Sequence, residues 1–177
     1  LVRSRGLGDV YKRQALRFCR MAEGAVIVGY GGLHLSVGRR TTRHALHALK
    51  LLVPLEGTLL YEGAGTIRSN VPVLVPADHE HAASCDGVSL CVFIPPEVRE
   101  GRLRGLARSD RPRITRGAVA RRLFALGRSI GRGLEHASTD DHARMLDEVV
   151  ATLTMCTATS APIDPRVRSV LAALDDD

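Results

Sequence analysis

The fold of this chain is decided by residues 38–81, which begin with GRRTTRHALH (38–47) and end with PADHEH (76–81). Both ends carry histidines, and turn signals such as Glu56-Gly57 lie between them. Two such segments on the strands of a small barrel direct their imidazoles into one interior. The stretch therefore predicts a β-barrel whose histidines face a shared cavity.

Short apolar runs alternate with turn residues along the chain as far as Pro95 and Pro96. Such spacing is typical of an antiparallel sandwich or barrel. After the two prolines, apolar residues recur at helical spacing. The sequence therefore predicts an α+β fold, in which a small antiparallel β-barrel is followed by two to three amphipathic helices. The expected strands are residues 25–28, 33–37, 45–55, 58–61, 71–75 and 88–94.

Two helices are predicted over Gly117 to Glu135 and Thr139 to Cys156, and Thr139-Asp140-Asp141 is expected to cap the second. A third helix is expected after the break at residues 160–162. Each of the first two helices has one apolar face, which we assign to dimerisation, with packing on the barrel as the alternative. The assigned residues are Val119, Leu123, Leu126, Ile130, Met145, Val149 and Leu153.

Composition fits one domain with an appendage, because 177 residues with 45% hydrophobic content can bury a core. Residues 1–14 supply half of the formal net charge of +6, resemble translated adapter sequence and are excluded from the fold. The sequence contains no apolar run of about 18 residues and no signal-peptide pattern, so we expect a cytoplasmic protein. The four cysteines form no CxxC pair and are expected to be reduced and buried.

The spacing of residues 38–81 resembles the two sequence motifs of the cupin (RmlC-like jelly-roll) family. The first motif runs Gly, five residues, His, one residue, His, three or four residues, Glu, six residues, Gly. The second runs Pro, one residue, Gly, two residues, His. The spacing is kept here, while several residue types differ. The matching positions hold Gly38, His44, Leu46, Lys50 and Gly57, and then Pro76, Asp78 and His81.

The cupin resemblance implies a metal site with four ligands, of which this sequence keeps two. Leu46 and Lys50 take the places of the second His and the Glu, which leaves His44 and His81 as ligands. An ammonium group at the Glu position repels a divalent cation, and two imidazoles rarely hold one alone. Recruitment of His47 needs a bulge, because its strand parity is opposite to that of His44. We therefore expect no bound metal and no cofactor.

Several of these residues also have an ordinary structural interpretation. The apolar residues of opposite parity within 49–55 favour a solvated, outward-pointing Lys50. His44 and His81 have the alternative role of buried, hydrogen-bonded core histidines. The arginines of residues 39–43 are expected at a solvated strand edge or loop.

Both halves of the chain together resemble the AraC/XylS family of transcriptional regulators. Residues 44–57, 73–81 and 91–97 resemble the amino-terminal sensor domain of that family. The segment IDPRVRSVLAAL (163–174) resembles the first helix of its DNA-binding domain. The resemblance covers roughly residues 24–177. It implies a sensor barrel at 15–97, a helical dimerisation and linker region at 98–160, and the start of a truncated helix-turn-helix domain at 161–177.

The AraC/XylS resemblance implies that a ligand controls a dimer. In that family a cupin-like barrel senses a small effector, helices dimerise, and a carboxy-terminal domain reads the major groove of DNA. We therefore expect a small-molecule effector, a homodimer, and operator contact only through the carboxy-terminal domain, with no catalytic residues and no membrane. The residues expected to bind the effector are His44, Leu46, Lys50 and His81.

Two other functions are kept as alternatives. A metal-dependent cupin enzyme, such as a dioxygenase or isomerase, needs two ligands beyond His44 and His81. A stand-alone small-molecule-binding cupin needs no DNA-binding domain, and residues 163–177 are then only a terminal helix.

Overall fold

The computed structural model describes residues 25–28, 31–96, 103, 106, 109–134 and 136–157. The predictions for residues 1–14 and for the third helix and the helix-turn-helix segment beyond residue 160 lie outside this part of the chain. Among the described residues, no helix is long and apolar enough to cross a membrane.

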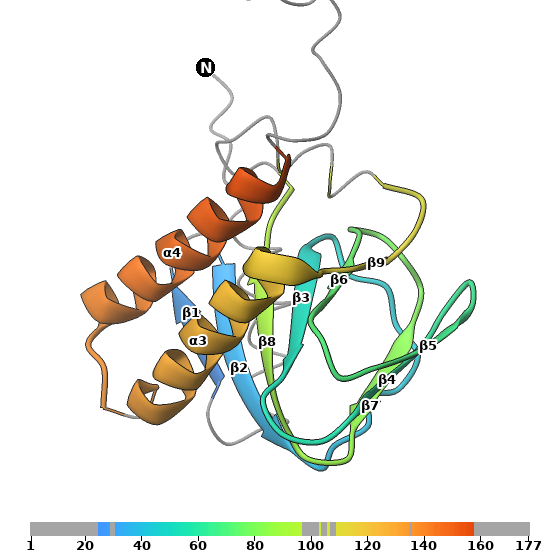
Figure 1. The fold of residues 1–177 in the computed structure, drawn as a ribbon, viewed down its shortest axis with the longest axis horizontal. Helices are drawn as coiled ribbons and strands as arrows, with labels where there is room; N and C mark the ends of the chain where they lie inside the picture. Colours follow the sequence, from blue (N-terminus) through green and yellow to red (C-terminus); the bar gives the residue numbers. More distant parts are fainter. Residues whose placement is uncertain are drawn as a thin grey trace, which may run out of the picture.

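Two antiparallel sheets form the β part of the fold (Figure 1). The six-stranded sheet has the order β1 (Ala25–Val28), β2 (Gly31–Val37), β8 (Val88–Ile94), β3 (Leu49–Pro54), β6 (Val73–Val75) and β9 (Arg113–Ile114). The three-stranded sheet has the order β5 (Thr66–Ser69), β4 (Leu59–Glu62) and β7 (Ala82–Cys85). Isolated bridges from Arg40 to Ser84 and from His44 to His81 add the segment before β3 to the free edge of β7.

The predicted α+β class and antiparallel pairing are confirmed, but the described strands form two sheets and not one closed barrel. The chain leaves the six-stranded sheet after β3 and again after β6. Gly57 and Asp78, which lie in these two connections, have φ values of 78° and 58°. Backbone in this left-handed region turns the chain sharply, and it favours glycine or aspartate over most residues. The chain thereby crosses between the sheets several times.

Two helices, α3 (Gly117–Gly133) and α4 (Thr139–Thr157), cover one face of the six-stranded sheet, and the smaller sheet lies on the other side (Figure 1). Helix α3 approaches β3 closely, because a Cβ atom on Gly127 would lie 3.3 Å from Val53 Cγ1 and 2.8 Å from Cδ2 of Leu55, the residue after the strand. A larger side chain at this position has to displace these two neighbours.

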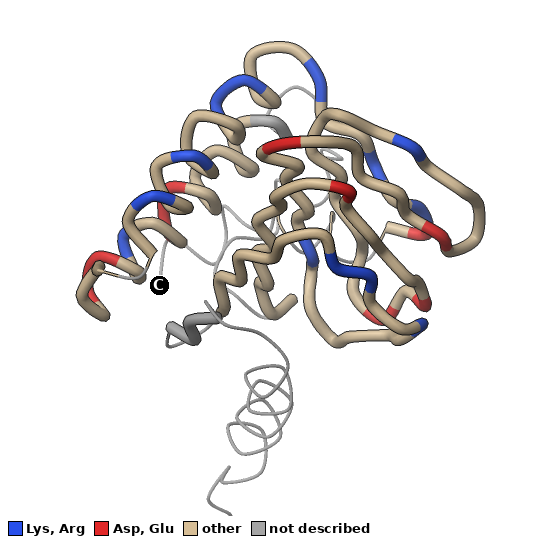
Figure 2. The backbone as a smooth tube through the Cα atoms, turned by 90° about the horizontal axis from the view of Figure 1, so that it is seen from below, with Lys and Arg blue, Asp and Glu red and all other residues tan. Residues whose placement is uncertain are grey.

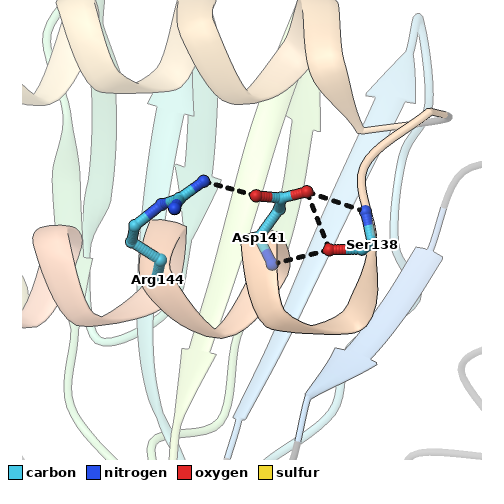
Figure 3. Close-up of polar contacts among 3 residues, drawn as sticks. All are labelled: Ser138, Asp141 and Arg144. Atoms are coloured by element: carbon cyan, nitrogen blue, oxygen red, sulfur yellow. Dashed lines mark hydrogen bonds and ion pairs between the residues drawn. The ribbon is translucent and has the colours of Figure 1, made fainter.

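The capping of α4 differs by one residue from the prediction. The Ser138 hydroxyl accepts a hydrogen bond from the Asp141 amide at 3.2 Å, and the Asp141 carboxylate accepts from the Ser138 amide at 3.1 Å (Figure 3). This reciprocal pair is a capping box, so Ser138 and not Thr139 is the N-cap. Arg144, one turn further on, also binds the Asp141 carboxylate. The side chain of Asp141 thus closes the first turn of the helix.

Strand β3 is buried along its whole length. Leu49, Leu51 and Val53 belong to the core between the sheet and the helices, whereas Leu52 belongs to a second core between the two sheets. Lys50 is only 2% exposed. The prediction of an outward, solvated Lys50 is therefore wrong, because both faces of this strand are covered.

The apolar helix residues assigned to dimerisation lie in the core of the single chain. Leu123, Ile130, Val149 and Leu153 are 1–2% exposed and pack in the helix–sheet core. The remaining three are partly buried against the same core. Packing on the sheet, the alternative for these faces, is the arrangement observed within the single chain for the four fully buried residues. The three partly buried residues are Val119, Leu126 and Met145.

Candidate functional site

The two predicted site histidines are direct neighbours across the edge of the smaller sheet. The backbones of His44 and His81 exchange two hydrogen bonds, each 2.9 Å long. Their ring centroids are 4.8 Å apart. The expectation that the two histidine-bearing segments bring their imidazoles together is therefore confirmed.

Each of these two imidazoles is anchored by a backbone carbonyl two residues earlier. His44 Nδ1 lies 2.6 Å from the Thr42 oxygen, and His81 Nδ1 lies 2.7 Å from the His79 oxygen. A carbonyl only accepts hydrogen bonds, so each Nδ1 must carry the proton. In the neutral ring the other nitrogen, Nε2, then carries the in-plane lone pair. Both Nε2 atoms are acceptors.

The two Nε2 lone pairs converge on the amine of Lys50. Lys50 Nζ lies 3.2 Å from His81 Nε2 and 3.5 Å from His44 Nε2. It also lies 5.7 Å from the centroid of the Phe93 ring, on the neighbouring strand β8. Lys50 therefore occupies the centre of the site, and the amine donates to both rings.

The site disfavours positive charge. Burial lowers the pKa of Lys50, with a smaller opposing effect from Cys91. Burial and the nearby Lys50 lower the pKa of His81 to about 4. Burial also lowers the pKa of His44, although its hydrogen bond to the Thr42 carbonyl opposes the shift. Burial is the largest cause of all three shifts, so the site favours the neutral form of each group.

These residues do not fit a metal ion. Within the described part of the chain, no three His, Cys, Asp or Glu side chains come together as ligands. The point at which the His44 and His81 lone pairs meet is taken by the Lys50 amine. The arrangement suits a nucleophilic amine or a hydrogen-bond donor better than a metal site.

Aromatic rings form one wall of the cluster. The Tyr61 ring stacks at 5.5 Å on His81 and at 6.4 Å on His79. Tyr61 Oη, His79 Nε2 and His34 Nε2 are buried and have no hydrogen-bond partner among the described residues. Buried polar atoms without a partner are rare in folded proteins.

Tyr61 and His34 were not predicted as site residues. His34 lies on β2 opposite Cys91, and both His34 and Cys91 interact electrostatically with Lys50. Tyr61 reaches His81 because β4 pairs with β7, a strand that has no apolar alternation in the sequence. No local sequence signal distinguishes either residue.

The remaining predicted residues lie at the border of the site. Leu46 is half-buried, and its carbonyl accepts a hydrogen bond of 2.7 Å from the Asp78 amide. His47 is not drawn into the cluster: its Nδ1 lies 2.7 Å from Asp78 Oδ2. The arginines of residues 39–43 are exposed, and Arg40 forms an ion pair of 2.8 Å with Glu62. The expectation that these arginines are solvated is confirmed.

The backbone supports the motif alignment. Gly38 and Gly57, at the glycine positions of the first cupin motif, have φ values of 56° and 78°. Asp78, at the glycine position of the second, has a φ of 58°. Glycine is favoured at all three positions because of this conformation, and aspartate is among the few other residues that tolerate it. The changed residue at 78 therefore keeps the turn that brings His81 to the cluster.

Comparison with known proteins supports the fold. No family model and no curated protein matches the chain. Among solved structures it is similar to the AraC-like transcriptional activator CuxR, with a TM-score of 0.57 and 13% identity, covering 80% of this chain and 56% of that chain. It is also similar to the protein of unknown function SPY1581 from Streptococcus pyogenes, with a TM-score of 0.36 and 21% identity, covering 41% of this chain and 71% of that one. A cupin superfamily protein from Desulfitobacterium hafniense DCB-2 has a TM-score of 0.36 and 17% identity, over 40% and 72% of the two chains. The chain thus shares its fold with an AraC-like activator and spans 56% of the length of that protein.

Proposed function

We propose that this chain is the effector-sensing part of an AraC-type transcription factor. The observation that carries the proposal is the buried Lys50–His44–His81 cluster in a domain with the fold of an AraC-like activator. Stable cores seldom bury an amine without a carboxylate partner, because its desolvation is unfavourable. A cluster of this kind is better explained by ligand binding than by stability.

In the proposed mechanism the effector binds one arrangement of the sensor more tightly than another, and this difference shifts the population of the regulator. The protein acts in the cytoplasm and has no catalytic step. Operator DNA is read by a carboxy-terminal helix-turn-helix domain, whose first helix residues 163–174 resemble in sequence. The described residues contribute no base contact in this mechanism.

The second element of the proposal is a homodimer formed by the outer faces of the two helices. The exposed charges of α3 are all arginines, whereas α4 exposes Asp140, Asp147 and Glu148 beside Arg144. Figure 2 allows these basic and acidic positions to be followed along the backbone. In a two-fold symmetric dimer, the basic face of α3 in each protomer meets the acidic face of α4 in its partner, so the contact is made twice. The exposed arginines of α3 are Arg121, Arg122, Arg128 and Arg132.

The dimer is tested by sedimentation equilibrium. Changing both Arg121 and Arg122 to Glu should weaken association, and high salt should weaken the wild-type dimer as well. Arg111→Glu is the control, because Arg111 is also exposed but lies before α3. A monomeric wild-type chain, or equal association of all variants, contradicts the dimer.

Sensing is tested by a thermal-shift screen of the whole chain against sugars, aromatic acids, small aldehydes and divalent metals. A ligand that binds only the folded state raises the melting temperature. We expect an organic compound to raise it, and the shift to disappear in His81→Ala but not in His136→Ala, which removes an exposed histidine outside the cluster. A shift that appears only with Fe²⁺, Mn²⁺ or Ni²⁺ favours the metal-dependent enzyme instead.

A further inference from the structure

We propose that Lys50 captures a small, uncharged aldehyde as a reversible imine, so that the effector is held by a covalent bond inside the sensor. The inference rests on the proposed sensing function and names the chemical class of its ligand. It follows from the placement of one amine between two acceptor nitrogens in a buried, largely apolar interior.

The hydrogen-bonding geometry leaves the Lys50 lone pair available for reaction. A neutral amine has two N–H bonds and one lone pair. The two N–H bonds are directed to His81 Nε2 at 3.2 Å and His44 Nε2 at 3.5 Å. A protonated amine has a third hydrogen, for which the described residues provide no acceptor. The site therefore holds Lys50 in the form that attacks a carbonyl carbon.

The surroundings of Lys50 select an uncharged ligand. Its cross-strand neighbours are Val75 and Phe93, and Leu52 and Tyr61 lie in the same inter-sheet core. A carboxylate on the ligand is disfavoured in this buried, largely apolar interior, because its desolvation is unfavourable. An aldehyde is favoured over a 2-oxo acid.

The capture step balances without a further reactant. The Lys50 nitrogen forms a bond to the aldehyde carbon, and the carbonyl oxygen takes up the proton lost by nitrogen to give a carbinolamine. Loss of the hydroxyl group with the remaining nitrogen proton, as water, then gives the C=N bond. The Nε2 atoms of His44 and His81 lie where they can accept and return these protons. Hydrolysis reverses the sequence, as a sensor requires.

The chain itself contains a control, since its only lysines are Lys12 and Lys50. The whole 177-residue chain is treated at about pH 7 with benzaldehyde and sodium cyanoborohydride, which reduces an imine to a stable benzylamine, and the adducts are mapped by peptide mass spectrometry. An ordinary lysine is neutral in about one molecule in 2,500 at this pH. We expect Lys50 to be benzylated at least about tenfold more than Lys12.

Two variants and one alternative substrate make the result decisive. Lys12→Arg should keep the adduct and Lys50→Met should lose it, while circular dichroism confirms that both remain folded. Glyoxylate is an aldehyde that carries a carboxylate, and its labelling of Lys50 relative to Lys12 should be about tenfold lower than that by benzaldehyde, because burial of the carboxylate is unfavourable. An equal Lys50-to-Lys12 ratio for the two aldehydes overturns the restriction to uncharged ligands.

The proposal is overturned if the native chain is labelled no more at Lys50 than at Lys12, or if Lys50 reacts only after unfolding in guanidinium chloride. These outcomes are separate from failure of the sensing function. A thermal shift by a compound without a carbonyl group, lost in His81→Ala, supports sensing while it refutes covalent capture. Absence of any shift together with absence of the adduct refutes both.

Discussion

His81 should make the protein less stable in mild acid. Its pKa is about 4 in the folded chain, against an ordinary value of 6.5. Because the folded pKa is depressed, the unfolded chain binds a proton between these two values while the folded chain does not. Stability is therefore complete above about pH 6.5 and is lost as the pH falls from there toward 4.

The size of the effect follows from the same two values. A pH of about 5.0 lies about 1.5 units below the pKa of the histidine in the unfolded chain. At 1.36 kcal/mol per unit, this difference corresponds to about 2 kcal/mol. The free energy of unfolding should fall by about this amount between about pH 7.5 and 5.0 through His81 alone. His44 and His34 act in the same direction, because burial lowers the pKa of both.

Urea denaturation at the two pH values measures the loss, and a variant isolates the part due to His81. His81→Gln cannot take up the proton, so its loss of stability over this pH range should be about 2 kcal/mol smaller than that of the wild type. His136→Gln, an exposed control, should behave as the wild type does. If wild type and His81→Gln lose the same stability, the assignment of a depressed pKa to His81 is refuted.

Two further substitutions test the packing of the helices. Ser138→Ala removes the capping box of α4 and should lower the free energy of unfolding by about 1 kcal/mol. Thr139→Ala should lower it less. Equal effects of the two substitutions contradict the assignment of Ser138 as the N-cap. Gly127→Val should lower the free energy of unfolding by about 1 to 3 kcal/mol, because the new Cβ meets Leu55. Ala125→Val, on the exposed face of α3, is the control. An unchanged urea midpoint for Gly127→Val contradicts the close approach of helix and sheet.

The strands that sequence patterns predict well are those bounded by turns on both sides. Residues 25–28 and 88–94 match β1 (Ala25–Val28) and β8 (Val88–Ile94). Strands β5 (Thr66–Ser69) and β7 (Ala82–Cys85) were missed, because TIRS and AASC contain few large apolar residues. Both are held in place by pairing with β4, and such pairing has no local signal.

The candidate site was predictable only for the residues whose positions the motif spacing determines. The motif spacing predicts that His44 and His81 meet, and the structure confirms it. Lys50 was expected in solvent, since alternation along a strand identifies one buried face and not two. Tyr61 enters the site through the pairing of β4 with β7, so it could not be predicted while β7 was unknown.

The amine in the middle of β3 also determines how that strand aligns with its neighbours. In the sequence LKLLVP, apolar residues occur on both faces, so a shift by one residue relative to β6 and β8 would leave hydrophobic burial almost unchanged. Lys50 removes this ambiguity. A shifted strand would place its amine among the leucines beneath the helices, away from the imidazoles of His44 and His81. Lys50, whose amine we propose to react with the ligand, therefore also gives a strand that is apolar on both faces a single register.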